Sequence, residues 1–198
     1  LVEGQKVIDM TKDAVEYVFH PNDSEQYEQL VTTETPQRVA AVVKIPKWNL
    51  EQVLNQNVIV VLDGVQDPGN VGTILRLCLG FDASLILIES VDVSSPKVIR
   101  SSVGAMFRVP WIKIEKSEAL LTIQELQRPV FRLERSDHAI SVSEVPQEQI
   151  VLITGSEGQG IQLEIEGKSL QIEHNEALES LNVANALGLI LHSIYSSK

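Results

Sequence analysis

Cysteine, long apolar runs and basic residues are all scarce in this chain of 198 residues, and the first two scarcities each exclude a class of protein. The single cysteine, Cys78, rules out an intramolecular disulfide framework and indicates a reducing compartment. No stretch approaches the roughly 20 apolar residues that span a bilayer, and no leader peptide opens the chain. We therefore expect a cytoplasmic protein without a membrane anchor. Because the chain opens on Leu1 rather than Met, we expect its true N-terminus to be missing.

The net charge of −11 is unfavourable for a nucleic-acid partner, since phosphate binding normally needs a surplus of Lys and Arg. The charges are unevenly distributed, however. Residues 97–135 hold eight basic and four acidic side chains, whereas residues 137–179 hold nine acids and one base, Lys168. Chance clustering on an ordinary solvated surface also explains this pattern. The charge therefore permits an RNA partner without requiring one.

The hydrophobic periodicity predicts strands that alternate with helices, which indicates an α/β fold with a mostly parallel sheet. The predicted strands are Val15–Phe19, Val39–Lys44, Val58–Leu62, Ser84–Ile88, Trp111–Ile114, Pro129–Leu133, Ile150–Thr154 and Ser169–Ile172. The predicted helices are Glu3–Lys12, Ser24–Val31, Val71–Gly80, Ser117–Gln127 and Asn182–Tyr195. We divide the chain into a small domain at 1–46, a linker at 47–57 and a larger domain at 58–198.

A first motif joins a buried strand to a helix and runs from Leu62 to Arg76, with an Asp-Pro-Gly turn in its middle. The helix is expected to begin at Asn70, either as an ordinary N-cap or as a functional amide. The apolar stripe of this helix includes Cys78, which we interpret as core. Arg76 points away from that stripe. It is either solvated or directed into a site at the carboxyl edge of the sheet, where open α/β folds bind ligands.

A second motif runs from Val151 to Ile161, where a strand leads into a loop with glycine at 155, 158 and 160. The spacing matches neither the dinucleotide fingerprint nor a P-loop, so this loop alone indicates a ligand site or a tight turn with equal weight. Glu157 within it suits a hydroxyl, an amine or a cation better than a phosphate.

A third motif, from Leu170 to Ala186, joins a last strand through a loop to a long C-terminal helix. Ser180 is a candidate N-cap. The helix carries two apolar rows, one containing Val183 and Leu187 and the other Ala184 and Leu191. A helix that is apolar on nearly two faces needs a second partner, which suggests self-association.

The four histidines, at 20, 138, 174 and 192, show no metal-ligand spacing, so we expect no metal site. Nothing resembles a nucleophile elbow either.

In this order, the three motifs resemble the signature motifs of the SpoU/TrmH-type RNA 2′-O-ribose methyltransferases of the SPOUT superfamily. The patterns are D-G-x-x-D-P-x-N-x-G-x-I-x-R, G-x-E-G-x-G and S-L-N-V-A, and the resemblance covers about residues 58–198. Residues 95–107 also resemble the family between its first two motifs. The segments at 1–4 and 34–43 resemble its small ribosomal-protein-like RNA-binding domain. One departure is Ile172-Glu-His174, where the family usually has Ile-Pro-Met near the adenine of its cofactor.

The resemblance implies a deep trefoil knot, S-adenosyl-L-methionine as cofactor, ribosomal or transfer RNA as substrate, and a homodimer. By motif matching, the reacting site would contain Asn70, Arg76, Glu157, Ser180 and Asn182. Cofactor contacts would come from Thr154, Gly155, Gly158, Ile172, Leu181 and Asn182. The basic side chains of Lys97, Arg100 and Arg108 would bind RNA.

Two alternatives remain open. A non-catalytic knotted RNA-binding homologue is favoured only by Glu173 and His174. A flavodoxin-like domain binding a phosphorylated ligand through the loop at 155–160 is disfavoured, because that loop contains no Lys or Arg.

Overall fold

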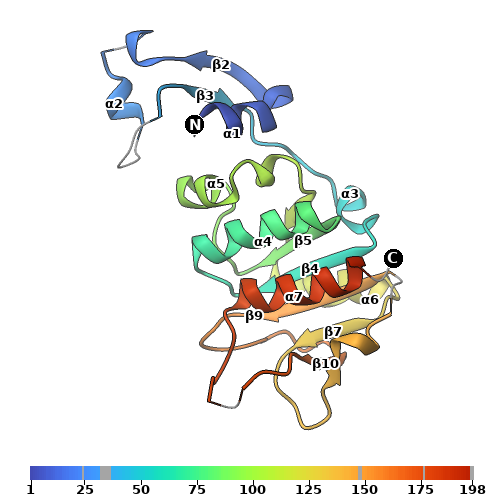
Figure 1. Cartoon of the computed structure of the whole chain (residues 1–198). Helices are drawn as coiled ribbons and strands as arrows, with labels where there is room; N and C mark the ends of the chain where they lie inside the picture. Colours follow the sequence, from blue (N-terminus) through green and yellow to red (C-terminus); the bar gives the residue numbers. More distant parts are fainter. Residues whose placement is uncertain (24, 32–36, 147–148, 176, 197–198) are drawn as a thin grey trace.

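The computed structural model describes residues 1–23, 25–31, 37–146, 149–175 and 177–196, and it contains two β-sheets (Figure 1). The smaller is antiparallel, with strand order β1-β3-β2. Its elements are β1 (Val2–Glu3), α1 (Gln5–Met10), β2 (Val15–Phe19), α2 (Tyr27–Leu30) and β3 (Ala40–Val43). Ser24, the predicted start of the second helix, and residues 34–36 of the family-like stretch lie outside the described residues.

The larger sheet has seven strands in the order β6-β5-β4-β9-β7-β10-β8, and every described pair is parallel. This confirms the predicted α/β class with its parallel sheet. The strands are β4 (Val58–Asp63), β5 (Ala83–Ile88), β6 (Trp111–Lys113), β7 (Val130–Leu133), β8 (Ile140–Ser141), β9 (Ile150–Gly155) and β10 (Lys168–Gln171). Single 3₁₀ turns occur at Lys12–Ala14, Pro21–Asp23, Ala105–Phe107 and Val142–Glu144.

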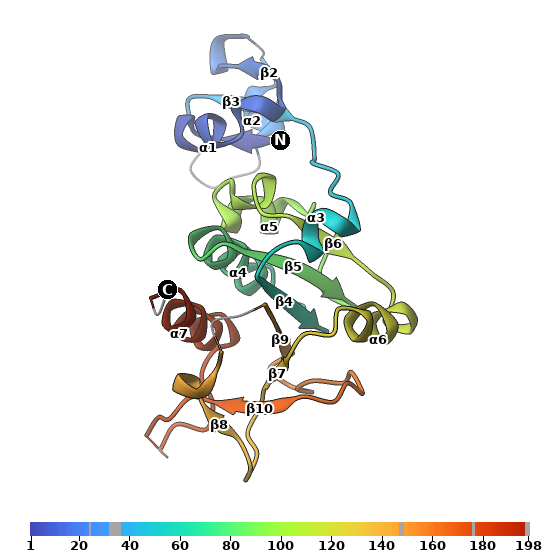
Figure 2. The same ribbon diagram turned by 90° about the vertical axis from the view of Figure 1, so that its right-hand side faces the viewer.

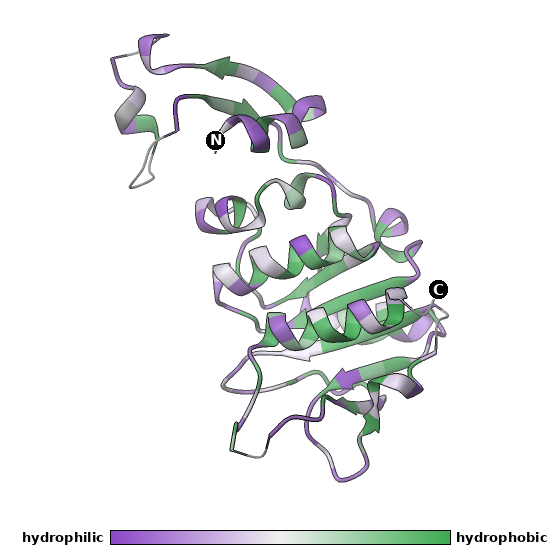
Figure 3. Cartoon of the chain, viewed as in Figure 1, coloured by the Kyte–Doolittle hydropathy of each residue, from purple (hydrophilic) through white to green (hydrophobic). Residues whose placement is uncertain are grey.

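Helices cover both faces of this sheet (Figure 2), whose central strands are largely hydrophobic (Figure 3). Alternate residues of a central strand face opposite layers. Val60 and Leu62 of β4 belong to the core under α4 (Pro68–Gly80), α5 (Pro96–Ser102) and α7 (Val183–Ser196). Ile59 and Val61 face α3 (Leu50–Leu54) and α6 (Lys116–Glu125). This double burial explains why β4 and β9 are apolar at nearly every position. In the part of the chain described, no helix is both long and apolar enough to cross a bilayer.

The segment interpreted as a linker at 47–57 contains a helix, α3, which the sequence analysis missed. The side chain of Asn49 accepts a hydrogen bond from the Gln52 backbone, and the Gln52 side chain accepts one from the Asn49 backbone. This capping box starts the helix. Val53 is fully buried, and its carbonyl accepts a 2.7 Å bond from Ser84 Oγ of β5. Residues 49–54 therefore pack on the larger sheet.

The two apolar rows of α7 do not need a second chain to cover them, so the argument from these rows for self-association was wrong. Val183, Ala184, Leu187, Ile190, Leu191 and Ile194 are all buried within the chain, because α7 packs on the sheet and also against α4, its neighbour in the same layer. Gly188 lies beside Leu77 of α4. The large apolar side chains of α7 that remain exposed are Leu189, at 53%, and Tyr195, at 42%.

Gly72 marks the closest approach of α4 to α5. A β-carbon at Gly72 would lie 1.9 Å from Ser101 Oγ and 2.7 Å from the Ser101 backbone carbon. We expect Gly72→Ala to lower the free energy of unfolding by about 1–3 kcal/mol, because the two helices must separate. The control Gly80→Ala, in the same helix, meets nothing within 4 Å and should be neutral or stabilising by less than about 1 kcal/mol. Urea denaturation measures both; equal stability of the two variants would refute this packing argument.

Candidate active site at the carboxyl edge of the sheet

The three sequence motifs converge because their strands end together. β4 and β9 pair in register, with Asp63 opposite Gly155, so the loops after them start side by side. The loop after β10 leads to the N-terminus of α7 at the same edge (Figure 1). This is the edge at which open α/β sheets bind ligands.

Asn70 is not the N-cap of α4, as the sequence had suggested. The helix begins at Pro68, and the side chain of Asp67 caps it by accepting a 2.7 Å bond from the Asn70 backbone. Proline at the first helical position has no N–H to satisfy, which favours this start. The Asn70 side chain is therefore free of capping and takes part in the site.

Asn70, Glu157 and Asn182 form a closed triangle of side-chain hydrogen bonds. Asn70 Nδ2 donates to Glu157 Oε1 at 3.0 Å, and Asn182 Nδ2 donates to the same oxygen at 3.1 Å. Asn182 Nδ2 also donates to Asn70 Oδ1 at 2.9 Å. We call these three residues the amide–carboxylate triangle. One residue comes from each motif, so the triangle joins segments that lie far apart in the sequence.

Asn182 has a second role, because it caps α7 in place of the predicted Ser180. Its Oδ1 accepts from the backbone N–H groups of Ala184, at 3.0 Å, and Asn185, at 3.3 Å. With the oxygen committed to the helix, the amide nitrogen must face Glu157 and Asn70. Glu157 Oε2 makes no hydrogen bond within the described residues, and it remains available to a ligand.

Asp63 is the first aspartate of the first motif, and the sequence alone gave no role for it. It is 1% exposed, and its Oδ2 accepts from the backbone N–H of Gln162, at 2.5 Å, and of Leu163, at 2.8 Å. A buried carboxylate needs such partners. Asp63 thereby fastens the end of the second motif to the end of β4.

The second motif turns tightly on itself at 156–160. Ser156 and Gly160 form an antiparallel bridge, and a β-carbon on Gly155 would lie 2.0 Å from the Gly160 carbonyl. Gly155 is thus required by close approach, and Gly160 by its φ of 64°. Gly158 has open space around it and a φ outside the positive range, so neither constraint applies there.

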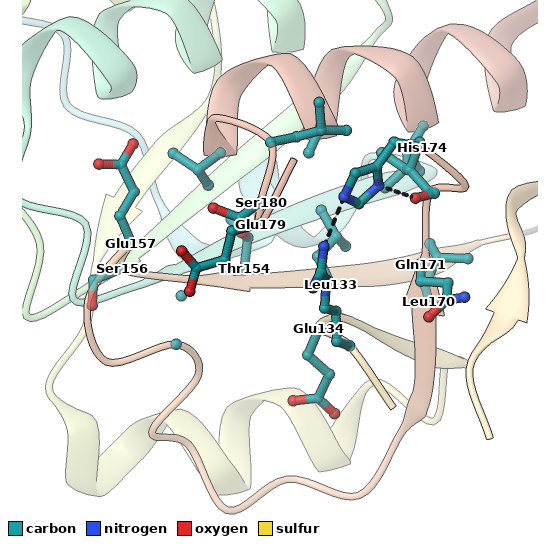
Figure 4. Close-up of a pocket in the computed structure, with 18 of the residues that line it drawn as sticks. Leu133, Glu134, Thr154, Ser156, Glu157, Leu170, Gln171, His174, Glu179 and Ser180 are labelled. Carbon is teal, nitrogen blue, oxygen red and sulfur yellow. Dashed lines mark hydrogen bonds between the residues drawn. The ribbon is translucent and has the colours of Figure 1, made fainter. Parts of the chain in front are cut away.

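A cavity of about 690 Å³ lies beside the triangle, and we call it the larger pocket. It is lined by the second and third motifs and the ends of β7 and β10, including four predicted cofactor residues: Thr154, Gly155, Ile172 and Leu181. Figure 4 shows Glu157 near one end and His174 at the other, with Thr154, Glu179 and Ser180 between them. Gly158 is not among its lining residues.

His174 lies at the far end of the larger pocket (Figure 4), and it contacts Arg135, which also lines that pocket. The His174 Nδ1 lies 2.7 Å from the Ile172 carbonyl, and its Nε2 lies 2.8 Å from Arg135 Nη2. A carbonyl only accepts and a guanidinium only donates, so this arrangement requires a neutral imidazole with its proton on Nδ1. Arg135 also donates to the Leu178 carbonyl at 3.2 Å. Where the family has Pro-Met, this chain has Glu173 and His174, and the His174 side chain forms part of the pocket wall.

A second cavity of about 460 Å³, the smaller pocket, lies on the other side of Glu157. It shares Ser156, Glu157 and Val183 with the larger pocket. Its other lining residues follow β4, begin α4, follow β5 or belong to the glycine loop: Gly64, Val65, Gln66, Asp67, Asn70, Glu89, Gly158 and Gln159. No group of residues that could hold a metal occurs in the described part of the chain.

Comparison with known proteins agrees with this arrangement. The family model of the SpoU rRNA methylase family matches residues 57–192. The chain belongs to this family. It is 30% identical to the 23S rRNA (guanosine(2553)-2′-O)-methyltransferase of Bacillus subtilis, over 85% of this chain and 68% of that protein. It is 32% identical to the 23S rRNA (adenosine(1067)-2′-O)-methyltransferase of Streptomyces laurentii, over 83% and 64%.

Among solved structures, an RNA methyltransferase of the TrmH family from Porphyromonas gingivalis is similar, with 28% identity and a TM-score of 0.84. The match covers 100% of this SpoU-family chain and 89% of that one. The AdoMet-bound rRNA methyltransferase from Sinorhizobium meliloti shares the fold, with 20% identity, a TM-score of 0.85 and coverage of 99% and 86%. The chain spans roughly three-fifths to two-thirds of the length of several curated relatives it matches.

Arg76, the arginine of the first motif, does not contact the amide–carboxylate triangle. Arg76 lies two turns after Asn70 on α4, is exposed, and has no hydrogen-bond or ion-pair partner among the described residues. It lines neither pocket. Ser180 lines the larger pocket without joining the triangle. Of the predicted RNA-binding residues, Lys97 and Arg100 are exposed on α5, and Arg108 lines a cavity together with Lys6 and Lys12.

Arg132 and Glu134 support the floor of the larger pocket. Arg132 donates to the carbonyls of Leu163, at 3.0 Å, and Ile165, at 2.8 Å, and to both oxygens of Glu134. The hydrogen bonds from Arg132 hold the pKa of Glu134 below its usual 4.5, more than offsetting partial desolvation, which raises it. Ser169 Oγ adds a 2.9 Å bond to the same carboxylate.

We expect Glu134→Gln to lower the free energy of unfolding at pH 7 by about 1 kcal/mol or less, since the pair is partly exposed. A carboxyl whose folded pKa is depressed stabilises above the unfolded pKa of 4.5 and loses that effect as pH falls below it. The difference from the parent should therefore be full at pH 6–7 and shrink below 4.5. Urea titrations with Glu125→Gln as control test this; a pH-independent difference would contradict it.

Proposed function

We propose that this chain is an S-adenosyl-L-methionine-dependent RNA methyltransferase, acting on a ribose 2′-hydroxyl of ribosomal or transfer RNA in the cytoplasm. The observation that carries the proposal is the amide–carboxylate triangle. It joins the family's three motifs at the boundary between two pockets. A methyl donor in one pocket and a methyl acceptor in the other can therefore meet beside Glu157. The names of the relatives, which are ribose methyltransferases of 23S rRNA, support the same activity.

The larger pocket suits the cofactor. Its volume lies within the range of small-molecule sites. Leu133, Leu170 and Ile190 give it apolar walls for an adenine, whereas Glu134, Glu157, Glu173 and Glu179 give it negative charge for a cationic ligand. The cofactor would supply a methyl carbon activated by a positively charged sulfonium. The wall formed by His174 and Arg135 keeps the pocket formed despite the unusual sequence, which favours the enzyme over a non-catalytic homologue.

Glu157 is proposed to orient the acceptor ribose. Its Oε1 is held by two amides, so Oε2 has a fixed direction and can accept a hydrogen bond from a ribose hydroxyl. In-line transfer depends on such alignment. Asn70 and Asn182 would position Glu157 and contact the reacting groups, and Ser180 and Leu181 would contact the cofactor from the third motif.

Arg76 is proposed to act in the site of a second copy of the chain. Within its own protomer it is exposed on α4, beside the helix whose exposed side chains include Leu189 and Tyr195. A homodimer through this face would cover both apolar side chains and carry Arg76 toward the partner's triangle. A guanidinium stays protonated, so its role there would be to hold an RNA phosphate and stabilise the developing alkoxide.

The remaining expectations belong to the same proposal. The antiparallel sheet of residues 2–43 would form an RNA-binding domain, and the basic side chains of α5 together with Arg108 would extend its surface. We also propose the family's trefoil knot, in which the segment from β10 to α7 passes through a loop of the preceding chain. The position of α7 beside α4, reached from an outer strand of the sheet, supports such a path (Figure 1).

We expect Arg76→Ala to lower methyl transfer by about 10²-fold or more, as when a preorganised charge-stabilising group is removed. Folding and calorimetric binding of S-adenosylhomocysteine should be unchanged. Arg76→Lys should retain part of the activity, since it keeps the charge but loses the planar fork. The assay measures tritiated methyl groups in ribose of unmodified rRNA transcripts. Full activity in Arg76→Ala, or label found on a base, would contradict the proposed mechanism.

Mixing two inactive variants tests where Arg76 acts. Arg76→Ala and Asn182→Ala, unfolded together and refolded, form mixed dimers in which one site has both residues. If Arg76 serves the partner's site, activity should recover to about a quarter of the parent, because half the dimers are mixed. If Arg76 serves its own protomer, every site in a mixed dimer lacks either Arg76 or Asn182, so no activity should return.

We expect Leu189→Asp to weaken the dimer by placing a charge in an apolar interface. The monomer should stay folded, because Leu189 is already exposed in it. Sedimentation equilibrium measures the dissociation constant, with Leu121→Asp, an exposed leucine on α6, as the matched control. An unchanged constant would place the interface elsewhere.

A further inference from the structure

We infer that the smaller pocket holds the base of the target nucleotide and that Glu89 selects guanine there. This inference rests on the proposed function, and it assigns the pocket and Glu89 roles that the three motifs do not provide. Glu157 lies between the smaller and the larger pocket, and both pockets are also lined by Ser156 and Val183.

The chemistry of the reaction fixes what must lie there. If the cofactor occupies the larger pocket, the acceptor oxygen approaches along the wall formed by Glu157. The base is attached to C1′ of the ribose, the carbon next to the one that bears the 2′-hydroxyl. The base of the methylated nucleotide therefore lies close to this wall, on the side away from the cofactor, and the smaller pocket is the cavity found on that side.

The lining of the smaller pocket suits a base rather than a phosphate. It contains three amide side chains, from Gln66, Asn70 and Gln159, and three carboxylates, from Asp67, Glu89 and Glu157. No Lys or Arg occurs among the lining residues that the structure describes. Phosphate sites need positive charge, whereas amides and carboxylates are among the groups that read the hydrogen-bonding edges of bases.

Glu89 has a left-handed backbone conformation, which is unusual for a residue that follows a strand. Four described residues other than glycine have positive φ. Asp82, Val103 and Gln127 follow the ends of α4, α5 and α6, where the left-handed conformation is common. Glu89, with φ 46°, follows a strand. This conformation is strained in a residue with a β-carbon, and such strain is concentrated at functional sites.

The surrounding hydrogen bonds hold that turn in place. The next residue, Ser90, is buried, and its Oγ accepts from the Val65 backbone at 3.0 Å and contacts the Leu62 carbonyl at 3.2 Å. Gln66 Nε2 donates to the Glu89 carbonyl. With Ser90 fixed inward, Glu89 is exposed at the pocket. Among the described residues its one ion pair, with Lys116, is long at 3.5 Å and solvent-exposed, so the carboxylate remains available to a ligand.

A carboxylate selects among the four bases by geometry. Its two oxygens accept side by side, and guanine is the base whose pairing edge offers two adjacent donors, the N1–H and the N2 amine. Adenine, cytosine and uracil each place an acceptor next to a donor on that edge. The amide N–H groups of Gln66 or Gln159 would then serve the guanine O6. Bidentate contacts of this kind give most of the discrimination between bases.

The test uses nucleoside monophosphates as probes, with S-adenosylhomocysteine at saturation. Affinities of GMP, IMP, AMP, CMP and UMP are measured by NMR titration of the chain, following the amides of residues 64–66 and 156–159. The phosphate is common to all five and cancels. IMP keeps the N1–H but lacks the N2 amine, so it removes half of the proposed contact. We expect GMP to bind about tenfold or more tightly than IMP, and more tightly than the other three.

Glu89→Gln should weaken GMP about tenfold and bring the ratio of GMP to IMP affinity close to one, because an amide cannot accept from both donors. The control Glu125→Gln removes the same charge from the end of α6, away from both pockets, and should keep the parent's ratio. Equal binding of GMP and IMP, an unchanged ratio in Glu89→Gln, or no shift in these amides at millimolar GMP would overturn the inference.

Failure of the proposed function gives a different result. Calorimetry with S-adenosylhomocysteine reports on the larger pocket, and Glu89→Gln should bind it as the parent does. If the parent gives no heat, the proposed cofactor is wrong. The guanine preference is then tested by the same nucleotide titrations carried out without S-adenosylhomocysteine. Normal cofactor binding without guanine preference would leave the methyltransferase intact and refute the assignment of Glu89.

Discussion

The site depends on the in-register parallel pairing of β4 with β9. This pairing places Asp63 opposite Gly155, so the first and second motifs leave the sheet at the same level. A slip of one residue would exchange the two faces of one strand, so that side chains which pack under α4 and α7 would face α3 and α6 instead. It would also separate Asp63 from the backbone of Gln162 and Leu163, which it fastens. The double burial of both strands therefore fixes the geometry of the triangle as well as the core.

Much of this architecture could be predicted because strong local signals agree with the tertiary structure. The continuous apolar run at 58–62 indicated a strand covered on both faces, and helices cover both faces of β4. The glycine loop and the last helix were located to within a residue or two. The family resemblance added what periodicity lacks, namely which polar side chains from distant motifs meet. Asn70, Glu157 and Asn182 do meet.

The errors arose where two local explanations competed or where a contact came from far along the chain. Asn70 and Asp67 both suit an N-cap, and Pro68 decides for Asp67. Ser180 and Asn182 compete in the same way at α7. The apolar rows of α7 could be counted, but the sequence does not show that α4 and the sheet together cover both. Asp63 and Glu89 depend on backbone groups and turns that only the folded chain brings together.

The triangle also determines when the site comes into existence during folding. Its bonds join residues separated by 87, 25 and 112 positions, so each closes a long loop that is entropically costly. Contacts of such range form late, and Asn182 cannot take its place before α7 has docked on α4. A partly folded chain with its sheet complete would still hold Glu157 without its two amides. Ligand affinity therefore reports on completion of the last tertiary step, and a ligand that binds only the finished site would draw the chain toward it by mass action.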